Sequence, residues 1–317
     1  MVKIVVTGGA GYIGSYLIKK LLEKGMFVVS VDNLFNGDYR HLEKYKGNQL
    51  ELVQGDIRNL KLLEKIVENA DCIVHLAAIS TLDKCYEKPE EAVSVNIYGT
   101  FQILEAAKKK GVSKVVFSSS AAVYGEPKIS PVDETYPVQP LNLYGITKLA
   151  GEKLLESYSI TDGVESIILR FGNVFGVGLY THWNSVIPKF VKQALDHVPL
   201  TLYGDGESIR EFVHIEDVTK AIMLAIDSKE ISCDKFNVGG EAARIKDIAF
   251  IVSEQVKKIE GCEVKIINLP ERIGEAKKIS FRIEKIKEKL DYKRDYTVEQ
   301  GVSQLIDYYR AIVKGKT

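Results

Sequence analysis

The chain has 317 residues, of which 45% are hydrophobic, and its 43 Lys and Arg residues balance 43 Asp and Glu residues. This length suggests two domains, or one large α/β domain with an appendage, and it allows a well-buried core. A neutral chain lacks the basic surface that non-specific nucleic-acid binding needs, and an anionic membrane does not attract it. The composition also excludes wholesale disorder.

The cysteines and the hydropathy of the chain indicate in which cellular compartment the protein is expected. The four cysteines, Cys72, Cys85, Cys233 and Cys262, form no CxxC pair and have no zinc-ligand spacing, and the five histidines have none either. We therefore expect no metal and a reducing compartment. No stretch has the length of a transmembrane helix, and Lys3–Val6 leads straight into a motif without room for a signal peptide. These features predict a cytoplasmic protein that binds neither membrane nor nucleic acid.

Short β-rich runs alternate with helical periodicity through the first half of the chain. Strands are expected at 3–6, 27–31, 50–53, 72–76, 114–118 and 166–169. A first helix should end at Gly25, and further helices are expected at 60–69, 90–110, 144–158 and 186–195. The alternation predicts an α/β fold with a Rossmann-like, doubly wound parallel sheet and helices on both of its faces.

The pattern loosens after about Arg170, where a glycine-containing loop follows the sixth strand. The last stretch, residues 246–314, mixes short strands with charged helices, and we interpret it as part of a smaller C-terminal α/β cap. The expected boundaries are 1–170 for the first domain, with a later return near 205–240, and 171–317 for most of a discontinuous second domain.

The turn between the first strand and the first helix carries Gly8, Gly11 and Gly14 in a GxxGxxG pattern. Glycines there let the backbone approach a pyrophosphate, and the helix N-terminus offers free N–H groups. A purely structural turn is the competing interpretation, but Asp32 also closes the second strand. A carboxylate there accepts hydrogen bonds from the ribose of NAD and repels the 2′-phosphate of NADP, so the pattern favours NAD. Asp56, after the third strand, is either an adenine contact or a turn residue.

A second group of polar residues suggests redox chemistry. Tyr144 and Lys148 stand at i and i+4 and share one helix face, and Ser120 lies just beyond the fifth strand. An ordinary tyrosine, with a pKa of about 10, is too weakly ionised at neutral pH to act as a base. A nearby ammonium and an oxidised nicotinamide ring favour the phenolate. We therefore expect Tyr144 to be the acid/base, Lys148 to supply the charge and bind the nicotinamide ribose, and Ser120 to polarise the substrate oxygen. A surface helix pair is the competing interpretation of Tyr144 and Lys148 taken alone.

Several motifs together resemble one family. They are TGGAGYIGS at Thr7–Ser15, DNL at Asp32–Leu34, GDIRN at Gly55–Asn59, HLAA at His75–Ala78, NxxGT at Asn96–Thr100, SSSAAVYG around Ser120 and YGITK around Tyr144. Over nearly its whole length the chain is similar to extended short-chain dehydrogenase/reductases of the NAD-dependent epimerase/dehydratase family, and most of all to nucleotide-sugar 4-epimerases of the UDP-glucose 4-epimerase type. The resemblance implies NAD contacts from Gly8, Gly11, Tyr12, Ile13, Gly14, Asp32, Asn33, Asp56, Ile57, Leu76, Ala77, Ala78, Asn96, Ser118, Tyr144 and Lys148.

The residues after Ser120 indicate which reaction of the family the site can support. The family's dehydratases carry Asp-Glu at this place and its UDP-glucuronate decarboxylases carry a Glu, whereas this chain has Ala121 and Ala122, which cannot transfer protons. The resemblance therefore implies reversible oxidation at C4 of a UDP-sugar. Tyr144 takes the C4-hydroxyl proton, the hydride passes to NAD, and the 4-keto sugar turns before the hydride returns to its opposite face. It also implies a homodimer through the helices at 90–110 and 144–158.

The second half of the chain carries the residues that the resemblance assigns to the sugar nucleotide. Together with Ser120 and Tyr144 they are Asn173, Ser185, Val186 and Arg210 for the diphosphate or sugar, Thr201 and Tyr203 for the uracil, Arg272 for the diphosphate, Glu275 for its ribose and Ile279 for the sugar pocket. A residue smaller than tyrosine at the last position is expected to admit a 2-acetamido group. Without the resemblance, the two arginines would be interpreted as surface ion pairs. Arg282 stands where the family usually has an Asp, which alters the local contacts expected in the cap.

Other functions stay open at this point. A UDP-glucuronate 4-epimerase or a one-way keto-sugar reductase keeps the fold and changes the sugar or the direction of the reaction. A redox sensor that only binds NAD would be expected to lack the set of Ser120, Tyr144 and Lys148. An amino-acid dehydrogenase on the same scaffold would not need arginines placed for a diphosphate.

Overall fold

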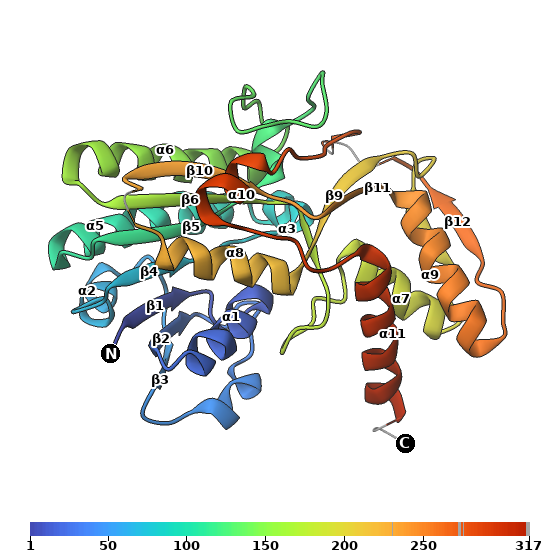
Figure 1. Cartoon of the computed structure of the whole chain (residues 1–317), viewed down its shortest axis with the longest axis horizontal. Helices are drawn as coiled ribbons and strands as arrows, with labels where there is room; N and C mark the ends of the chain where they lie inside the picture. Colours follow the sequence, from blue (N-terminus) through green and yellow to red (C-terminus); the bar gives the residue numbers. More distant parts are fainter. Residues whose placement is uncertain (230, 272–273, 275, 315–317) are drawn as a thin grey trace.

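The computed structural model of the protein describes residues 1–229, 231–271, 274 and 276–314. Its centre is a seven-stranded sheet in the order β10-β6-β5-β4-β1-β2-β3, in which neighbouring strands are parallel (Figure 1). The strands are β1 (Lys3–Thr7), β2 (Phe27–Asp32), β3 (Leu50–Gln54), β4 (Cys72–His75), β5 (Lys114–Ser120), β6 (Glu165–Phe171) and β10 (Cys233–Val238). This arrangement confirms the expected Rossmann-like α/β fold, and the first six strands lie where the sequence predicts them.

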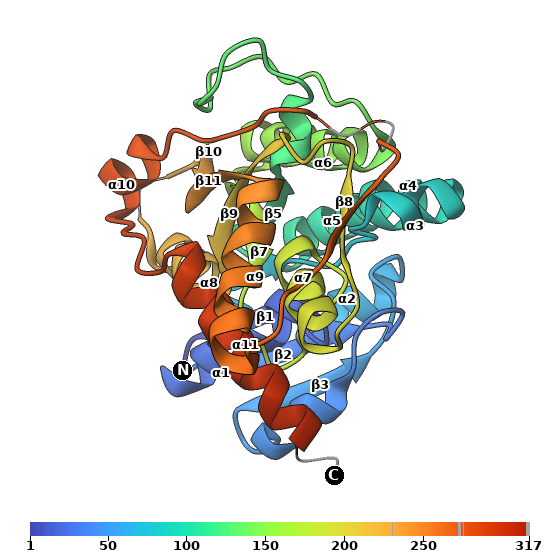
Figure 2. The same ribbon diagram turned by 90° about the vertical axis from the view of Figure 1, so that its right-hand side faces the viewer.

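The second half of the chain adds two small sheets beside the carboxyl ends of the parallel strands. One contains β7 (Asn173–Phe175), β9 (Ile209–His214) and β11 (Glu241–Arg244), and the other pairs β8 (Leu200–Tyr203) with β12 (Ile266–Leu269). Three helices pack together there around an apolar cluster of their own (Figure 2). They are α7 (Val186–Leu195), α9 (Ile245–Glu260) and α11 (Val298–Lys314).

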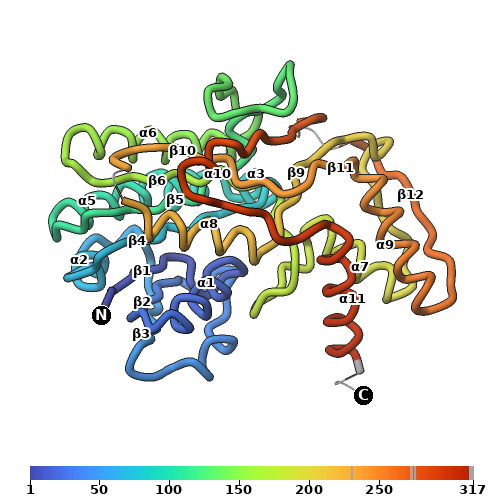
Figure 3. The backbone as a smooth tube through the Cα atoms, viewed as in Figure 1, coloured from blue at the N-terminus to red at the C-terminus, as the bar shows by residue number. Residues whose placement is uncertain are grey.

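The C-terminal segment passes between the two parts of the molecule more than once. After β12 the chain returns to the main sheet, where α10 (Glu284–Leu290) packs on β10, and it then runs back so that α11 packs on α7 (Figure 3). The seventh strand, β10, comes from the same late part of the sequence, and its residues were not expected to form a strand. The sheet and the cap are therefore both assembled from segments that lie far apart in the chain.

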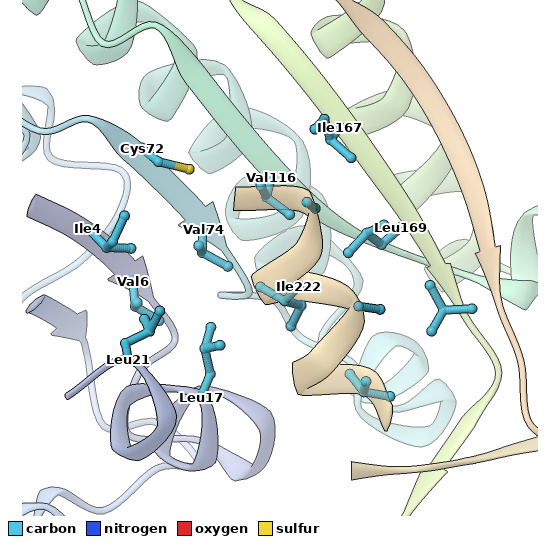
Figure 4. Packing of buried hydrophobic residues seen from close by; sticks show 14 of the residues in the cluster. Ile4, Val6, Leu17, Leu21, Cys72, Val74, Val116, Ile167, Leu169 and Ile222 are labelled. Atoms are coloured by element: carbon cyan, nitrogen blue, oxygen red, sulfur yellow. The ribbon is translucent and has the colours of Figure 1, made fainter. Parts of the chain in front are cut away.

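Helices cover both faces of the sheet because successive residues of a buried strand point to opposite sides. In β1, Ile4 and Val6 face α1 (Tyr12–Glu23) and α8 (Ile215–Asp227), together with Leu17 and Ile222 of those helices (Figure 4). Val5 faces the opposite cluster, which contains residues of α2 (Leu60–Ile66), α3 (Leu82–Glu87), α4 (Pro89–Val93), α5 (Thr100–Lys110) and α6 (Leu143–Asp162). The sheet thus has no exposed face, which agrees with its nearly continuous apolar strands.

One expected helix differs from the observed structure. The single helix expected at 90–110 is instead α4, a π-helical segment at Ser94–Gly99, and α5. Residues 89–110 are helical throughout, and the π-helical segment is one turn inside that run. Periodicity separates helices from strands and does not separate one type of helical turn from another. Across the described part of the chain, no helix combines the length and the apolar character that a membrane crossing requires.

Candidate active site

A cleft of about 1000 Å³ lies between the carboxyl ends of the main-sheet strands and the cap. It opens beside β1 and β4, the neighbouring strands from which the chain connections diverge in opposite directions. Ligands of open α/β sheets bind at this position. Of the site residues expected from the sequence, the cleft is lined by Gly8, Gly11, Tyr12, Ile13, Gly14, Asp32, Asn33, Asp56, Ile57, Leu76, Ala77, Ala78, Ser118, Ser120, Tyr144, Lys148, Asn173, Ser185, Val186, Thr201, Tyr203, Arg210 and Ile279.

The glycine turn between β1 and α1 is closed so tightly that no side chain fits. Gly8 has a φ of +70°, and a Cβ on it would lie 2.7 Å from the backbone nitrogen of Ala77. A Cβ on Gly14 would lie 2.2 Å from the carbonyl oxygen of Gly8. Gly11 is the N-cap of α1 and has no side chain to occupy the first N–H groups of the helix. These donors and the positive end of the helix dipole face the cleft, so the turn fits a pyrophosphate.

Asp32 is held in a fixed orientation at the end of β2. Its carboxylate accepts hydrogen bonds from the backbone N–H groups of Leu34, at 2.8 Å, and Ala10, at 3.1 Å. Burial raises the pKa of Asp32 above its ordinary value, although the two backbone donors oppose this effect. A fixed carboxylate beside the glycine turn fits the ribose hydroxyls of NAD.

Asp56 has a different environment from Asp32. Its carboxylate accepts a hydrogen bond from the backbone of Arg58 and is bound by the guanidinium of the same residue, with a shortest distance of 2.6 Å. The Arg58 guanidinium lowers the pKa of Asp56. Asp56 lines the cleft, but its oxygens are engaged in this turn, which supports the turn interpretation that the sequence left open.

Asn96 is the described candidate that does not line the cleft. Its amide donates to the carbonyl of Ile79 at 3.0 Å and to Thr147 at 2.9 Å, and its oxygen accepts from the N–H of Ile79 at 2.8 Å. Asn96 is 3% exposed, so its polar atoms are used inside the protein. The structure thus shows Asn96 holding the segment after β4 beneath the cleft, and the expected contact with the cofactor stays a prediction.

Ser120, Tyr144 and Lys148 come together at the end of β5 and the start of α6. Asn142 caps α6 by accepting a hydrogen bond from Gly145, which orients the first turns of the helix toward Ser120. The Lys148 ammonium donates to the carbonyl of Ser118 at 2.8 Å and lies 5.9 Å from the ring centre of Tyr144. Two residues of one helix face and one strand end thus form a single group, in which Lys148 is buried and Ser120 and Tyr144 are half-buried at the cleft.

Burial changes the pKa values of this group in opposite directions. Burial raises the pKa of Tyr144 to about 12, and a hydrogen bond with Ser120 works against that rise. Burial lowers the pKa of Lys148 to about 8. Near neutral pH Lys148 is therefore still charged, although it holds its proton less tightly than an ordinary lysine. Its positive charge favours the phenolate form of Tyr144. The arrangement can remove a proton from an alcohol bound beside Ser120 and return it.

The opposite wall of the cleft comes from the cap. Ser185 is the N-cap of α7, and its hydroxyl donates to the carbonyl of His182 at 3.0 Å, so it does not occupy the first N–H groups of the helix. Tyr203 of β8 lies under the Lys189 ammonium, which is 5.5 Å from the ring centre. An N-terminal helix end and an ammonium suit a diphosphate. Arg272 and Glu275, assigned to the same ligand, lie outside the described residues.

Ile279 both lines the cleft and packs in the cap. It is 5% exposed and belongs to an apolar cluster with Tyr124, Val132 and Phe281. Its N–H donates to the carbonyl of Ile209 at 3.1 Å, which fixes its backbone.

The sequence analysis missed several residues of the cleft. Lys84, Tyr180, His182 and Lys189 line it as well. Lys84 is in the first turn of α3, which Thr81 caps, but no motif separates it from other surface lysines. Burial lowers the pKa of His182, so this histidine is neutral near pH 7. Among the residues that the structure describes, no group of three or more His, Cys, Asp or Glu side chains could hold a metal ion.

Comparison with known proteins assigns the family. A sequence model of the NAD dependent epimerase/dehydratase family matches residues 4–239. The UDP-glucose 4-epimerase of Corynebacterium glutamicum is 32% identical over 314 residues, covering 93% of this chain and 92% of the relative. The UDP-glucuronic acid 4-epimerase of Bacillus cereus, solved with UDP-glucuronic acid and NAD, has 31% identity and a TM-score of 0.90 and covers 98% of this chain and 100% of its own. The dTDP-glucose 4,6-dehydratase of Streptomyces venezuelae, solved with NAD, has 29% identity and a TM-score of 0.90, over 98% of this chain and 97% of its own.

The fold and the cleft define a dinucleotide-binding α/β protein. The chain belongs to the NAD dependent epimerase/dehydratase family, which includes epimerases and dehydratases of nucleotide sugars. Its cofactor is NAD, and the glycine turn and Asp32 fit that cofactor.

Proposed function

We propose that the protein is a UDP-sugar 4-epimerase that interconverts UDP-glucose and UDP-galactose through a 4-keto intermediate. The observation that carries this proposal is the composition of the cleft next to Ser120. Ala121 and Ala122 line the cleft beside Ser120. The dehydratases that the chain resembles carry Asp-Glu at these two positions. The described acidic residues that line the cleft come from elsewhere, namely Asp32, Asp56, Asp83, Glu87 and Glu91. The site thus has one acid/base tyrosine and no carboxylate beside Ser120 for the elimination of water.

The reaction follows from the chemistry of the buried group. NAD, when bound, accepts a hydride from C4 of the sugar and gives it back. Tyr144 takes the proton of the C4 hydroxyl and later returns it. Lys148 stabilises the phenolate by its charge, and Ser120 hydrogen-bonds the substrate oxygen. Because the hydride removed from C4 is returned to C4, the reaction would consume no external reductant, and Tyr144 would take up and release the proton at each step.

The proposal divides the cleft between the two parts of the chain. Residues 1–170 would bind NAD, with a return near 205–240, and most of residues 171–317 would bind the sugar nucleotide. The start of α7, with Ser185 and Val186, and Arg210 of β9 would hold the diphosphate. Thr201 and Tyr203, both on β8, would face the uracil. Asn173 would contact the diphosphate or the sugar from β7.

Substrate range is the finer part of the proposal. Ile279 is smaller than tyrosine and lines the cleft, which supports room for a 2-acetamido group. UDP-GlcNAc and UDP-GalNAc would then be substrates besides the plain hexoses. UDP-glucuronate is the second candidate, because the UDP-glucuronic acid 4-epimerase of Bacillus cereus is 31% identical to this chain over 98% of its length.

The experiment that tests the proposal is incubation of the purified protein with a panel of UDP- and dTDP-sugars, with products identified by NMR. We expect the C4 epimer of UDP-glucose, NAD that stays bound during purification, and no net change in nicotinamide absorbance. A 4-keto-6-deoxy product would instead identify a dehydratase. Net oxidation of NADH would identify a reductase, and turnover of UDP-glucuronate alone would favour the second candidate.

We further propose a homodimer in the cytoplasm. Apolar side chains are exposed on the π-helical segment that leads into α5, with Tyr98 at 49%, and on α6, with Ile146 at 49% and Ile160 at 84%. The four cysteines are free thiols, which supports a reducing compartment. Light scattering coupled to size-exclusion chromatography would measure the oligomeric state.

A further inference from the structure

Beneath the cleft, α6 and β6 bury an ion pair that the mechanism above does not use. Glu152 is 0% exposed and Arg170 is 1% exposed, and neither lines the cleft. Arg170 donates from Nε to Oε1 of Glu152 at 2.9 Å and from Nη2 to Oε2 at 2.6 Å. Removing two charges from water is costly, and apolar residues of similar volume often give equal or greater stability. The pair therefore calls for an explanation other than stability.

The pair is bonded directly to the strand that carries Ser120. The hydroxyl of Ser119 donates to Oε1 of Glu152. Ser119 is also paired with Arg170 in the β5–β6 register, and Ser120 is the next residue. Glu152 and Arg170 thus hold the end of β5 from both the helix side and the strand side.

The pair also lies next to Lys148. Glu152 follows Lys148 by four residues on α6, as Lys148 follows Tyr144, so the three share one helix face. The described ionisable groups that face the Lys148 ammonium are Cys85 on α3, His75 on β4, and Tyr144 and Glu152 on α6 itself.

Three of these four groups are neutral near pH 7. Burial raises the pKa of the Cys85 thiol, lowers the pKa of His75 to about 3 and raises the pKa of Tyr144 to about 12. The Glu152 carboxylate is therefore the charged group among the four, and the positive charge of Arg170 offsets its negative charge.

The guanidinium of Arg170 is fixed on its other side as well. It donates from Nη1 to the hydroxyl of Tyr124 at 2.8 Å, and Tyr124 donates to Asn237 of β10 at 2.7 Å. The amide of Asn237 then donates to the carbonyl of Val132 at 3.1 Å. Arginine stays charged at every relevant pH, so this buried positive charge is permanent.

We propose that Glu152 and Arg170 are a positioning pair for the catalytic residues. Glu152 holds the Ser119–Ser120 strand end, and the two opposite charges together keep the electrostatic potential at Lys148 close to neutral. The proposal rests on the proposed function for its activity measurements and not for its titration measurement.

The decisive experiment compares a single and a double variant. Glu152→Gln leaves the guanidinium without a counter-charge, which disfavours the Lys148 ammonium, so the midpoint of the Lys148 titration should fall by about 0.5–1 pH unit. The kcat should then fall about two- to fivefold near pH 8 and much less near pH 6.5, because the charged fraction of Lys148 falls by that factor. KM should stay unchanged, because the pair does not line the cleft. Glu152→Gln with Arg170→Met removes both charges and should return the midpoint to the wild-type value. If the pair had a merely structural role, the double variant would have the lower kcat of the two variants, and the Lys148 midpoint would be unchanged in both.

The titration is measured without substrate, by ¹³C NMR of the lysine ε-carbons, with Lys148→Met assigning the resonance. Ser119→Ala removes the link to β5 and no charge, so kcat should fall several-fold while the midpoint stays. Glu156→Gln is the matched control, one turn further along α6, where Glu156 pairs with Lys153 and Lys235. It should change neither quantity.

Two results would overturn the proposal. One is an unchanged Lys148 midpoint in folded Glu152→Gln, and the other is an unchanged kcat in Ser119→Ala. If Glu152→Gln fails to fold, Ser119→Ala still decides, because it leaves no buried charge unpaired and an unchanged kcat would contradict the proposal. Absence of turnover with any UDP-sugar in the wild type would remove the proposed function while the titration still tests the pair.

Discussion

The two walls of the cleft are built in different ways. The wall next to the main sheet consists of strand ends and short turns whose contacts are mostly with backbone, such as the Gly8–Ala77 approach and the two N–H bonds to Asp32. The opposite wall is assembled from β7, α7, β8, β9 and the segment after Gly274, joined by loops and side-chain packing. A backbone cradle tolerates few substitutions, whereas a wall of separate side chains can change one residue at a time. Under the proposed function, the molecule therefore combines a sheet wall that binds NAD with a substrate wall that can change one residue at a time.

The largest expected effect lies where the two walls meet. Tyr144→Phe keeps the ring and removes the acid/base hydroxyl, so kcat should fall at least about 100-fold with folding intact. Turnover of UDP-glucose and thermal unfolding would measure the two quantities. Activity within a few-fold of the wild type would show that another group moves the proton.

The next effect concerns the sheet wall. Asp32→Ala removes a charged acceptor for the NAD ribose, which typically costs about 1.5–3 kcal/mol of binding free energy and should relax selection against NADP. Calorimetric titration of the cofactor-free protein with NAD and NADP would measure both. Asp56→Ala is the matched control, since Asp56 is engaged by Arg58, and its effect on NAD affinity should be clearly smaller. Equal losses of NAD affinity in the two variants would show that Asp32 and Asp56 do not differ in their roles.

The same contrast explains how much the sequence could predict. The sheet wall follows from local patterns, since Gly8, Gly14 and Asp32 lie within two strand–turn units, and the cleft contains them as expected. Lys84 and His182 were missed because their place in the cleft depends on how distant segments pack. Asn96 matched a family motif, yet its hydrogen bonds go to Ile79 and Thr147. A motif indicates that a residue matters, and the fold is needed to show which atoms its side chain contacts.

The stability of the cap should respond to pH through Glu211 of β9, which lies between two residues that line the cleft, Arg210 and Phe212. This side chain is 4% exposed and accepts hydrogen bonds from the N–H groups of Gly240, at 2.8 Å, and Phe281, at 3.0 Å. Burial raises the pKa of Glu211 to about 6, above its ordinary value of 4.5. Because the folded state holds this proton more tightly, its stabilising contribution is full below pH 4.5 and is lost as the pH rises through 6. The loss amounts to about 2 kcal/mol of the free energy of unfolding.

Urea unfolding at several pH values between 4.5 and 7.5 measures this contribution against Glu211→Gln, which does not titrate. The difference between wild type and variant should change by about that amount across the range. A constant difference would show that Glu211 has its ordinary pKa in the folded protein.

The smallest expected effect tests whether the substrate wall can be adjusted one residue at a time. Ile279→Tyr should reduce kcat/KM for UDP-GlcNAc roughly tenfold more than for UDP-glucose, because a clash with the acetamido group affects one substrate alone. Parallel assays of the two sugars give the ratio, and Ile279→Leu, which conserves volume, is the control. Equal losses on both sugars would identify Ile279 as a packing residue of the cap.

The π-helical segment at Ser94–Gly99 sets a rule for insertions and deletions in this region. A π-helical turn holds one residue more than an α-helical turn, so the segment amounts to a one-residue insertion between α4 and α5. Deleting one residue there would restore α-helical spacing and rotate everything on one side of the deletion by about 100° relative to the other. Asn96 would then turn away from Ile79, and the chain after β4 would lose the two hydrogen bonds by which Asn96 holds it under the cleft. The length of this helical run is thus tied to the position of the loop it supports, so a change in one requires a matching change in the other.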